Sequence, residues 1–153
     1  IVENEKFEET GVSRSISMGL RISNNKKNII IYGDLVFDNL LFSEIPDESS
    51  IWIDTKDKLL SSKVGITKEN SYAVNFDYGL KPKWFSIMLL MNNELELYKS
   101  LGSHIDNRKM AGHEILNKII DRGGSFKWFE SKKYKLIEID SVKDLEKVKK
   151  IIK

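Results

Sequence analysis

The feature that most constrains the fold is an unbroken apolar run, Ile29–Tyr32, that leads directly into a Gly-Asp pair. A short apolar run closed by a turn signal predicts a buried strand. Because the run does not alternate with polar residues, it is typical of a strand covered on both faces, as in a parallel or mixed α/β sheet. Gly33 permits a sharp turn and leaves Asp34 just beyond the carboxyl end of the strand. Ligands of open α/β sheets bind at that edge, so Asp34 is a candidate contact for a ligand or a metal.

A second aspartate, Asp140, follows the same pattern, because it comes after the apolar segment KLIEI and precedes an amphipathic segment. If the two strands run parallel, Asp34 and Asp140 lie at the same edge of the sheet. Mg²⁺ takes oxygen ligands and is typically held by one or two carboxylates together with substrate phosphates. The pair therefore predicts a magnesium site. The alternative is that each aspartate only serves a turn, where this residue is common.

The composition indicates one globular domain. A chain of 153 residues, 41% hydrophobic and 31% charged, can bury a substantial core. Lysine and arginine number 25 against 23 acidic residues, which gives no electrostatic argument for nucleic acid as a partner. Cysteine is absent, and no apolar run reaches the roughly 20 residues of a membrane span. We expect a cytoplasmic protein without a membrane partner. Because the sequence begins with Ile1 rather than Met, we also expect residues ahead of it.

The rest of the chain predicts alternating strands and helices. The tryptophans fall in the predicted strands and are expected in the core rather than on a base-stacking surface. No internal repeat is present. Strands are expected at 50–54, 71–77, 83–91, 125–130 and 134–139, a polar hairpin at 56–66, and helices within 10–22, 37–45, 94–101, 109–122 and 141–153.

Polar residues at the predicted helix starts are candidates for caps or for ligand contacts. Ser13 or Ser15 is expected to cap the first helix, and a helix start preceded by glycine and serine also suits an anion. Ser141 with Asp144 is a capping-box pattern. We expect His113 to be a surface or capping histidine rather than a catalyst.

Four segments together resemble one family. The motif IIIYGDLVFD, the helix KMAGHEILNKIIDRGG and the ending YKLIEIDSVKDLEKVKKII look like the later part of a nucleotidyltransferase domain of the sugar-phosphate and phosphocholine type. The segment EETGVSRSISMGL is similar to the one that precedes the Gly-Asp strand in that family. The resemblance covers nearly the whole chain and implies a mixed, mostly parallel Rossmann-like sheet flanked by helices, in a single domain over residues 1–153.

The resemblance also implies a reaction and a set of site residues. Members of this family transfer a nucleoside monophosphate from an NTP to a phosphorylated small molecule, such as a sugar phosphate or phosphocholine, and release pyrophosphate. Asp34 and Asp140 match the two aspartates that hold the catalytic Mg²⁺. The other positions implied are Ser13 and Ser15 near the nucleotide, and Lys83, Ser86 and Glu114 on the acceptor side.

The sequence departs from the family at its beginning. Family members start with a strand and a glycine-rich loop, carrying Arg and a following Pro-Lys, that grips the triphosphate. Nothing in this chain matches that loop, since Gly123–Gly124 closes a predicted helix instead. We expect an N-terminally incomplete domain that lacks at least two βαβ-sized units of roughly 30 residues each. The unpaired edge left by a missing strand would invite self-association or a partner chain.

Two other readings stay open. One is a non-catalytic remnant that serves as a binding or assembly module, which the missing loop favours and the two retained aspartates oppose. Tight binding of Mg²⁺ would separate this reading from the enzyme. The other is a glycosyltransferase of related fold, but Asp34 and Asp38 are too far apart for its Asp-x-Asp metal motif.

Overall fold

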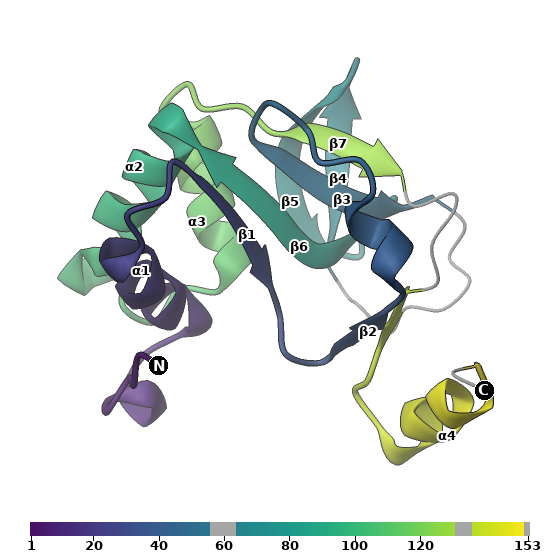
Figure 1. Cartoon of the computed structure of the whole chain (residues 1–153). Coiled ribbons are helices and arrows are strands. Elements are labelled where there is room, and N and C mark those ends of the chain that lie inside the picture. Colours follow the sequence, from purple (N-terminus) through teal and green to yellow (C-terminus); the bar gives the residue numbers. More distant parts are fainter. Residues whose placement is uncertain (56–63, 131–135, 152–153) are drawn as a thin grey trace.

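The computed structural model describes residues 1–55, 64–130 and 136–151, which form a six-stranded mixed sheet with helices packed on one face (Figure 1). The order across the sheet is β1-β6-β3-β7-β5-β4, and two further strands, β2 and β8, pair in a small separate sheet. The strands are β1 (Lys27–Ile31), β2 (Leu35–Phe37), β3 (Ser50–Asp54), β4 (Val64–Glu69), β5 (Tyr72–Tyr78), β6 (Lys83–Met91), β7 (Lys127–Glu130) and β8 (Leu136–Glu138).

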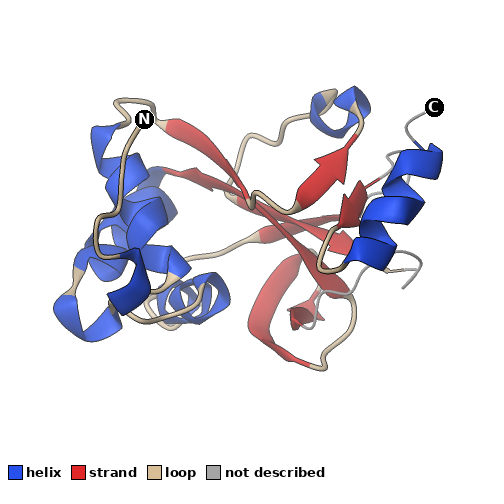
Figure 2. Ribbon diagram, turned by 90° about the horizontal axis from the view of Figure 1, so that it is seen from below, coloured by secondary structure: helices blue, strands red, loops and turns tan. Residues whose placement is uncertain are grey.

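The helices form two unequal groups on opposite sides of the strands. Figure 2 shows a cluster of helices at one side, while the C-terminal helix lies at the other. The clustered helices are α1 (Val12–Ile22), α2 (Asn92–Ser103) and α3 (Gly112–Ile120), and the separate helix is α4 (Val142–Ile151). Short 3-10 helices occupy Phe7–Glu9, Asn39–Phe42 and Ile105–Asn107. None of the described helices is long and apolar enough to cross a membrane.

The prediction of a mostly parallel sheet is wrong. Among the described strands, β3 and β7 pair in parallel, whereas the other pairings are antiparallel. Strand β1 has β6 as its single partner among the described strands and lies at an edge of the sheet that they form. Its residues are nevertheless apolar because both faces are covered: Ile30 packs on the helix side and Ile29 on the opposite side. The apolar run therefore reports cover on both faces and carries no information on strand direction.

Each face of the sheet has its own core. In β3, Ile51 and Ile53 pack toward the helices, and Trp52 packs toward the opposite layer, as the period of a strand requires. The opposite layer comprises the 3-10 helix Asn39–Phe42 and the β2–β8 sheet, through Leu41, Leu35 and Leu136 among others. The core role expected for the tryptophans is confirmed for Trp52 and Trp84, which are both buried.

The element boundaries agree in part with the sequence-based expectations. Helices expected at 94–101, 109–122 and 141–153 correspond to α2, α3 and α4 with shifted ends. The helix expected within 37–45 is a short 3-10 helix, Asn39–Phe42. Most of the polar hairpin expected at 56–66 lies outside the described residues, as does the start of the strand expected at 134–139.

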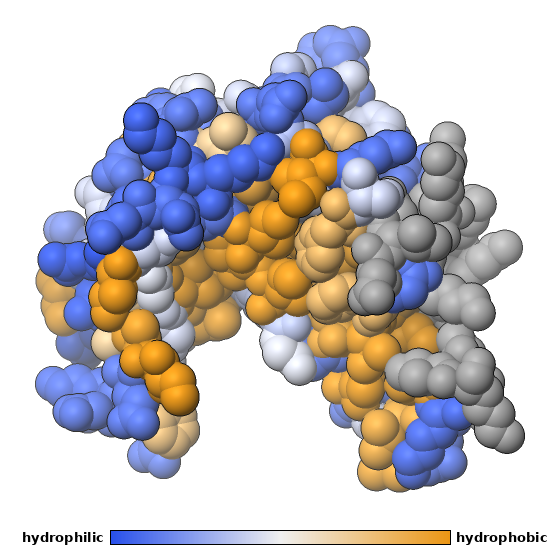
Figure 3. Space-filling view, viewed as in Figure 1, coloured by the Kyte–Doolittle hydropathy of each residue, from blue (hydrophilic) through white to orange (hydrophobic). Residues whose placement is uncertain are grey.

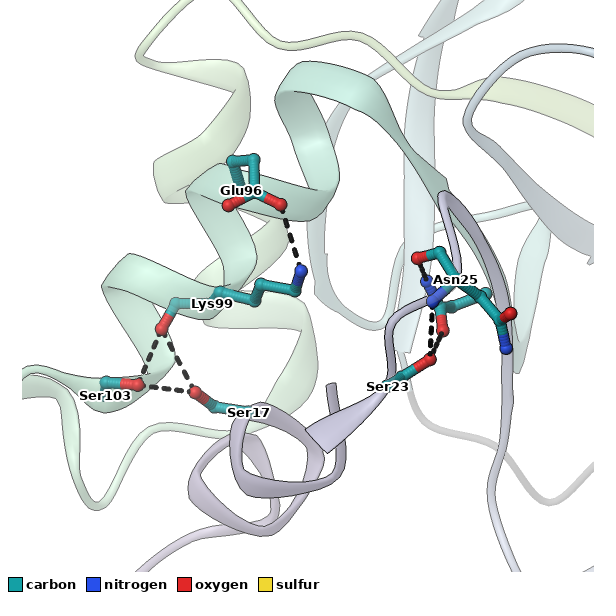
Figure 4. A network of polar contacts seen from close by, with 7 residues as sticks. Ser17, Ser23, Asn25, Glu96, Lys99 and Ser103 are labelled. Carbon is teal, nitrogen blue, oxygen red and sulfur yellow. Dashed lines mark hydrogen bonds and ion pairs between the residues drawn. The ribbon is translucent and has the colours of Figure 1, made fainter. Parts of the chain in front are cut away.

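Helices α1 and α2 pack closely where Gly102 faces Ser17. A Cβ atom on Gly102 would lie 2.8 Å from the Ser17 Cβ and 3.0 Å from the Ser13 carbonyl oxygen. The Ser17 hydroxyl donates to the Lys99 carbonyl at 3.1 Å, and its oxygen lies 2.7 Å from that of Ser103 (Figure 4). The absence of a side chain at Gly102 allows these hydroxyls to link the two helices.

We predict that Gly102→Ala lowers the free energy of unfolding by about 1–3 kcal/mol, because the added methyl group overpacks the α1–α2 contact. Helix propensity alone would predict the opposite sign. The matched control is Gly19→Ala in α1, where an added Cβ meets nothing within 4 Å and where stability should rise by roughly 0.5–1 kcal/mol. Urea unfolding followed by circular dichroism measures both values. Equal stabilisation by the two substitutions would contradict the packing argument.

Candidate active site

A cavity of about 610 Å³ lies between the helix layer and the C-terminal part of the chain. Figure 3 shows the molecule hollowed between the side that carries α1 and the side that carries α4. The lining residues come from segments far apart in the sequence. They include Val12 of α1, Gly112 and His113 of α3, and Ser141 and Asp144 beside α4. The cavity is large enough for a phosphorylated small molecule.

Three carboxylates converge at this cavity. Asp34, Glu138 and Asp140 each offer one oxygen, and these oxygens all lie within 4.8 Å of one another. The antiparallel pairing of β2 with β8 brings them together, since Leu35 lies opposite Glu138. The Ile139 amide also donates to the Asp34 carbonyl oxygen at 2.8 Å. The two aspartates thus meet, as the sequence suggested. The reason differs from the predicted one: Asp34 precedes β2, and Asp140 follows β8, its antiparallel partner.

Sequence reasoning missed Glu138, although a signal was present. Glu138 and Asp140 are two residues apart at the end of a strand, and this spacing places both side chains on one face. Glu138 is 8% exposed. The sequence of a single strand does not distinguish a buried acidic residue from one on a solvated face. The position of the third carboxylate became clear only from the pairing of β2 with β8.

The carboxylate cluster fits a divalent cation. The Asp34 Oδ1 atom is buried without a hydrogen-bond partner among the described residues. Buried polar atoms are normally paired, and neighbouring carboxylates repel one another unless a cation lies between them. Oxygen ligands from three acidic side chains are the donor set that Mg²⁺ prefers. The residues present therefore fit a magnesium ion at this position.

Tyr32 forms one wall of the cavity beside the carboxylates. Its hydroxyl lies against Gly112, where an added Cβ would clash with it, and its ring packs edge-on against Trp84 at 5.8 Å between centroids. Burial, with a smaller contribution from the Asp34 carboxylate, raises the pKa of Tyr32 far above its usual range. The hydroxyl therefore stays protonated, and it is buried without a hydrogen-bond partner among the described residues.

A bulge in β6 directs Ser86 to the cavity. The register between β3 and β6 shifts, because Ile51 lies opposite Met88 while Ile53 lies opposite Trp84. Ser86 lies within this bulge at a φ of 58°, in the left-handed region that few residues other than glycine adopt. Bulges commonly re-aim a side chain near functional sites. Ser86 was expected on the acceptor side, and the structure places it in the cavity lining.

His113 is a buried wall residue, so the prediction of a surface or capping histidine is wrong. The side chain is 8% exposed and packs edge-on against Tyr78, with the ring centroids 5.2 Å apart. Burial lowers the pKa of His113, and the Glu114 and Asp77 carboxylates oppose that effect. The imidazole is consequently held in its neutral form at neutral pH.

Four of the expected substrate contacts lie elsewhere. Glu114 caps α3, since its Oε2 atom accepts a hydrogen bond from the Ala111 amide at 2.6 Å. Ser13 is fully buried on the inner face of α1, whereas Ser15 is exposed and accepts a hydrogen bond from the Asn4 side chain. The prediction that one of them caps α1 is wrong, since the N-cap is Gly11 and no side chain caps the helix. Lys83 lies opposite Asp54 in the β3–β6 ladder. None of these four is among the described residues that line the cavity.

We predict that His113 makes folding stability depend on pH. Its pKa is lower in the folded state than the value of about 6.5 expected for an unfolded chain. The unfolded state therefore takes up the proton first as pH falls. The contribution of the neutral imidazole to the free energy of unfolding is complete above about pH 6.5. It is lost as the pH drops through the pKa that His113 has in the folded state.

Urea unfolding at a series of pH values from about 5 to 8 measures this dependence. His113→Gln should flatten the curve by up to about 1.4 kcal/mol per pH unit. The matched control is His104→Gln, which replaces the other histidine of the chain, at an exposed turn. An unchanged pH dependence in His113→Gln would contradict the assignment.

Comparison with solved structures shows what the chain resembles. It superposes on the inositol-1-phosphate CTP transferase from T. maritima with a TM-score of 0.79 at 20% identity, covering 99% of this chain and 64% of that chain. The CTP:phosphocholine cytidylyltransferase from Streptococcus pneumoniae superposes with a TM-score of 0.73 at 14% identity, covering 98% of this chain and 67% of that chain. HddC from Yersinia pseudotuberculosis superposes with a TM-score of 0.69 at 17% identity, covering 100% of this chain and 66% of that chain.

No protein-family model and no curated protein sequence matches the chain. The chain spans about two thirds of the length of the solved structures that it resembles. The family resemblance expected from the sequence is supported by these structures at the level of the fold. The chain therefore has the fold of the nucleotidyltransferases that act on phosphorylated small molecules.

Proposed function

We propose that this chain carries the magnesium-binding and acceptor-binding part of a nucleotidyltransferase. The reaction would move a nucleoside monophosphate from an NTP to a sugar phosphate or a phosphocholine-like acceptor. The observation that carries the proposal is the convergence of Asp34, Glu138 and Asp140 at a 610 Å³ cavity. The neighbouring structures support the reaction class, since two of them are named as enzymes that use CTP with inositol 1-phosphate and with phosphocholine.

The proposed reaction forms one P–O bond at the α-phosphorus and breaks another. An oxygen of the acceptor phosphate attacks the α-phosphorus of the NTP and forms a new P–O bond. The bond from the α-phosphorus to the bridging oxygen breaks, and pyrophosphate leaves. Mg²⁺, held by Asp34, Glu138 and Asp140, would supply charge neutralisation on the phosphoryl oxygens. No side-chain nucleophile is required, so the residues of the chain act through position and charge.

The cavity walls suit the orientation of an acceptor. The Ser86 hydroxyl offers a hydrogen bond, and Tyr32, Tyr78 and Trp84 offer aromatic surface. Gly112 and His113, in the first turn of α3, line the same cavity, and helix starts favour negatively charged groups. These groups would hold the acceptor phosphate in front of the carboxylate cluster.

The described part of the cavity lining has no positively charged side chain to bind a triphosphate. No lysine or arginine is among the described residues that line it. This observation favours the alternative proposal of a non-catalytic module that keeps the fold. It equally suits an enzyme whose basic groups come from another polypeptide segment.

We predict that the chain binds Mg²⁺ through the carboxylate cluster. Isothermal titration calorimetry should detect one ion per chain, and Asp34→Asn or Asp140→Asn should weaken binding by about 10–100-fold, since each removes a charged ligand. The matched control is Asp106→Asn, because Asp106 lies in an exposed turn away from the cavity. Equal binding by Asp34→Asn and Asp106→Asn would contradict this site.

We also predict that pyrophosphate release by this chain alone, with Mg²⁺, an NTP and a matching acceptor, is slow, because the triphosphate-binding loop of the family has no match in it. A panel of the four NTPs with phosphocholine and sugar 1-phosphates identifies the pair. Asp34→Asn and Asp140→Asn should reduce the rate by about 100-fold or more, because they remove charge stabilisation at the reacting phosphate. Absence of release with every pair, while Mg²⁺ still binds, would overturn autonomous catalysis and support the non-catalytic module.

A further inference from the structure

The candidate active site has two chemically different walls. The carboxylates come from the β2–β8 sheet and the start of α4, whereas the main sheet contributes aromatic rings. Tyr32, Tyr78 and Trp84 line this second side of the cavity, which we call the aromatic wall. An acceptor whose phosphate lies at the carboxylate cluster would therefore place its other end against the aromatic wall.

The rings of the aromatic wall are set at steep angles to their neighbours. Tyr32 and Trp84 pack edge-on, with 73° between the ring planes. Tyr78 is 62% exposed and packs edge-on against His113, which also lines the cavity. Each ring face carries partial negative charge, and rings set at angles around a space are the arrangement that binds quaternary ammonium groups.

The aromatic wall offers few hydrogen bonds. The Trp84 indole N–H already donates to the Ile87 carbonyl at 3.0 Å, and the Glu114 carboxylate is occupied in capping α3. Val64 lies opposite Tyr78 in the β4–β5 ladder and adds an aliphatic side chain to the same lining. Buried sugar hydroxyls need hydrogen-bond partners, whereas a quaternary ammonium group has no N–H to satisfy and presents methyl groups instead.

The charges of the cavity favour a positively charged ligand over a neutral one. Asp34 and Asp140 line it, as does Asp144, whose charge is offset by an ion pair with Lys147 at 2.9 Å. His113 is held neutral and adds no repelling charge. Opposite charges attract more strongly in a partly buried site than in water. The carboxylates therefore raise the affinity of the cavity for a cation.

We propose that the acceptor carries a quaternary ammonium group, which binds against Tyr32, Tyr78 and Trp84 while its phosphate lies at the carboxylate cluster. Acceptors of this class are preferred over sugar phosphates, which share the phosphate and lack the positive charge. Tyr78 determines this specificity, because its ring is the most exposed of the three. The inference rests on the proposed function, since it names the acceptor class of the same cavity.

Isothermal titration calorimetry of the chain with Mg²⁺, and without NTP, tests the preference for a cation. Phosphocholine should bind about tenfold more tightly than its neutral isostere, in which a tert-butyl group replaces the trimethylammonium group, because the shape is kept while the cation–π contacts are lost. Phosphocholine should also bind more tightly than inositol 1-phosphate. Equal affinities for phosphocholine and the isostere, tighter binding of inositol 1-phosphate, or binding of none of the three compounds each overturn the proposal.

Substitutions of Tyr78 test the role of its ring. Tyr78→Leu should reduce the preference for phosphocholine over the isostere by about threefold or more, since it keeps an apolar side chain and removes the ring. Tyr78→Phe should retain the preference. The matched control is Tyr72→Leu, because Tyr72 is 40% exposed on the same strand and is not among the described residues that line the cavity. An unchanged preference in Tyr78→Leu overturns the assignment of specificity to Tyr78.

The binding measurements separate this inference from the proposed function, because neither requires turnover. A preference for phosphocholine without pyrophosphate release from any NTP contradicts the proposed reaction alone. Release with sugar phosphates, together with equal affinities for phosphocholine and its isostere, contradicts the ammonium-binding wall alone.

Discussion

The antiparallel pairing of β2 with β8 is the interaction on which the candidate site depends. These two strands of three residues each join the first third of the chain to its end. Because Asp34 precedes β2 and Asp140 follows β8, the pairing converts two distant sequence positions into one cluster. It also places Glu138 beside them. A shift of one residue in this register would turn Glu138 away from the cavity, since successive side chains on a strand point to opposite faces.

The opposite wall of the cavity depends on local exceptions to regular structure. Ser86 adopts a positive φ within a bulge of β6, and Gly112 leaves room for the Tyr32 hydroxyl at the start of α3. Both features are costly or weakly stabilising by themselves. They persist because the surrounding core fixes the strands and helices that carry them, which is how strained backbone is generally kept near functional sites. The cavity is therefore shaped by the sheet and the helix layer together.

The sequence predicted those parts of the molecule that local pattern determines. The strand, which the structure gives as Lys27–Ile31, and the Gly-Asp turn are present. One half of the capping box is present too, with the Asp144 amide donating to the Ser141 hydroxyl at 3.3 Å. Strand direction was not predictable, because an apolar run reports burial on both faces and nothing more. Glu114 was assigned to a pocket by resemblance, but an acidic residue at the third position of a helix also caps it, and the structure uses it in that way.

The charges of the described residues around the cavity are predominantly negative. One Mg²⁺ does not neutralise three ionised carboxylates, and a bound triphosphate would add further negative charge. The described lining offers hydroxyls, amides and a histidine held neutral, none of which supplies a compensating positive charge. A compensating positive charge therefore has to come from outside the described lining, which is what an enzyme completed by another polypeptide segment requires.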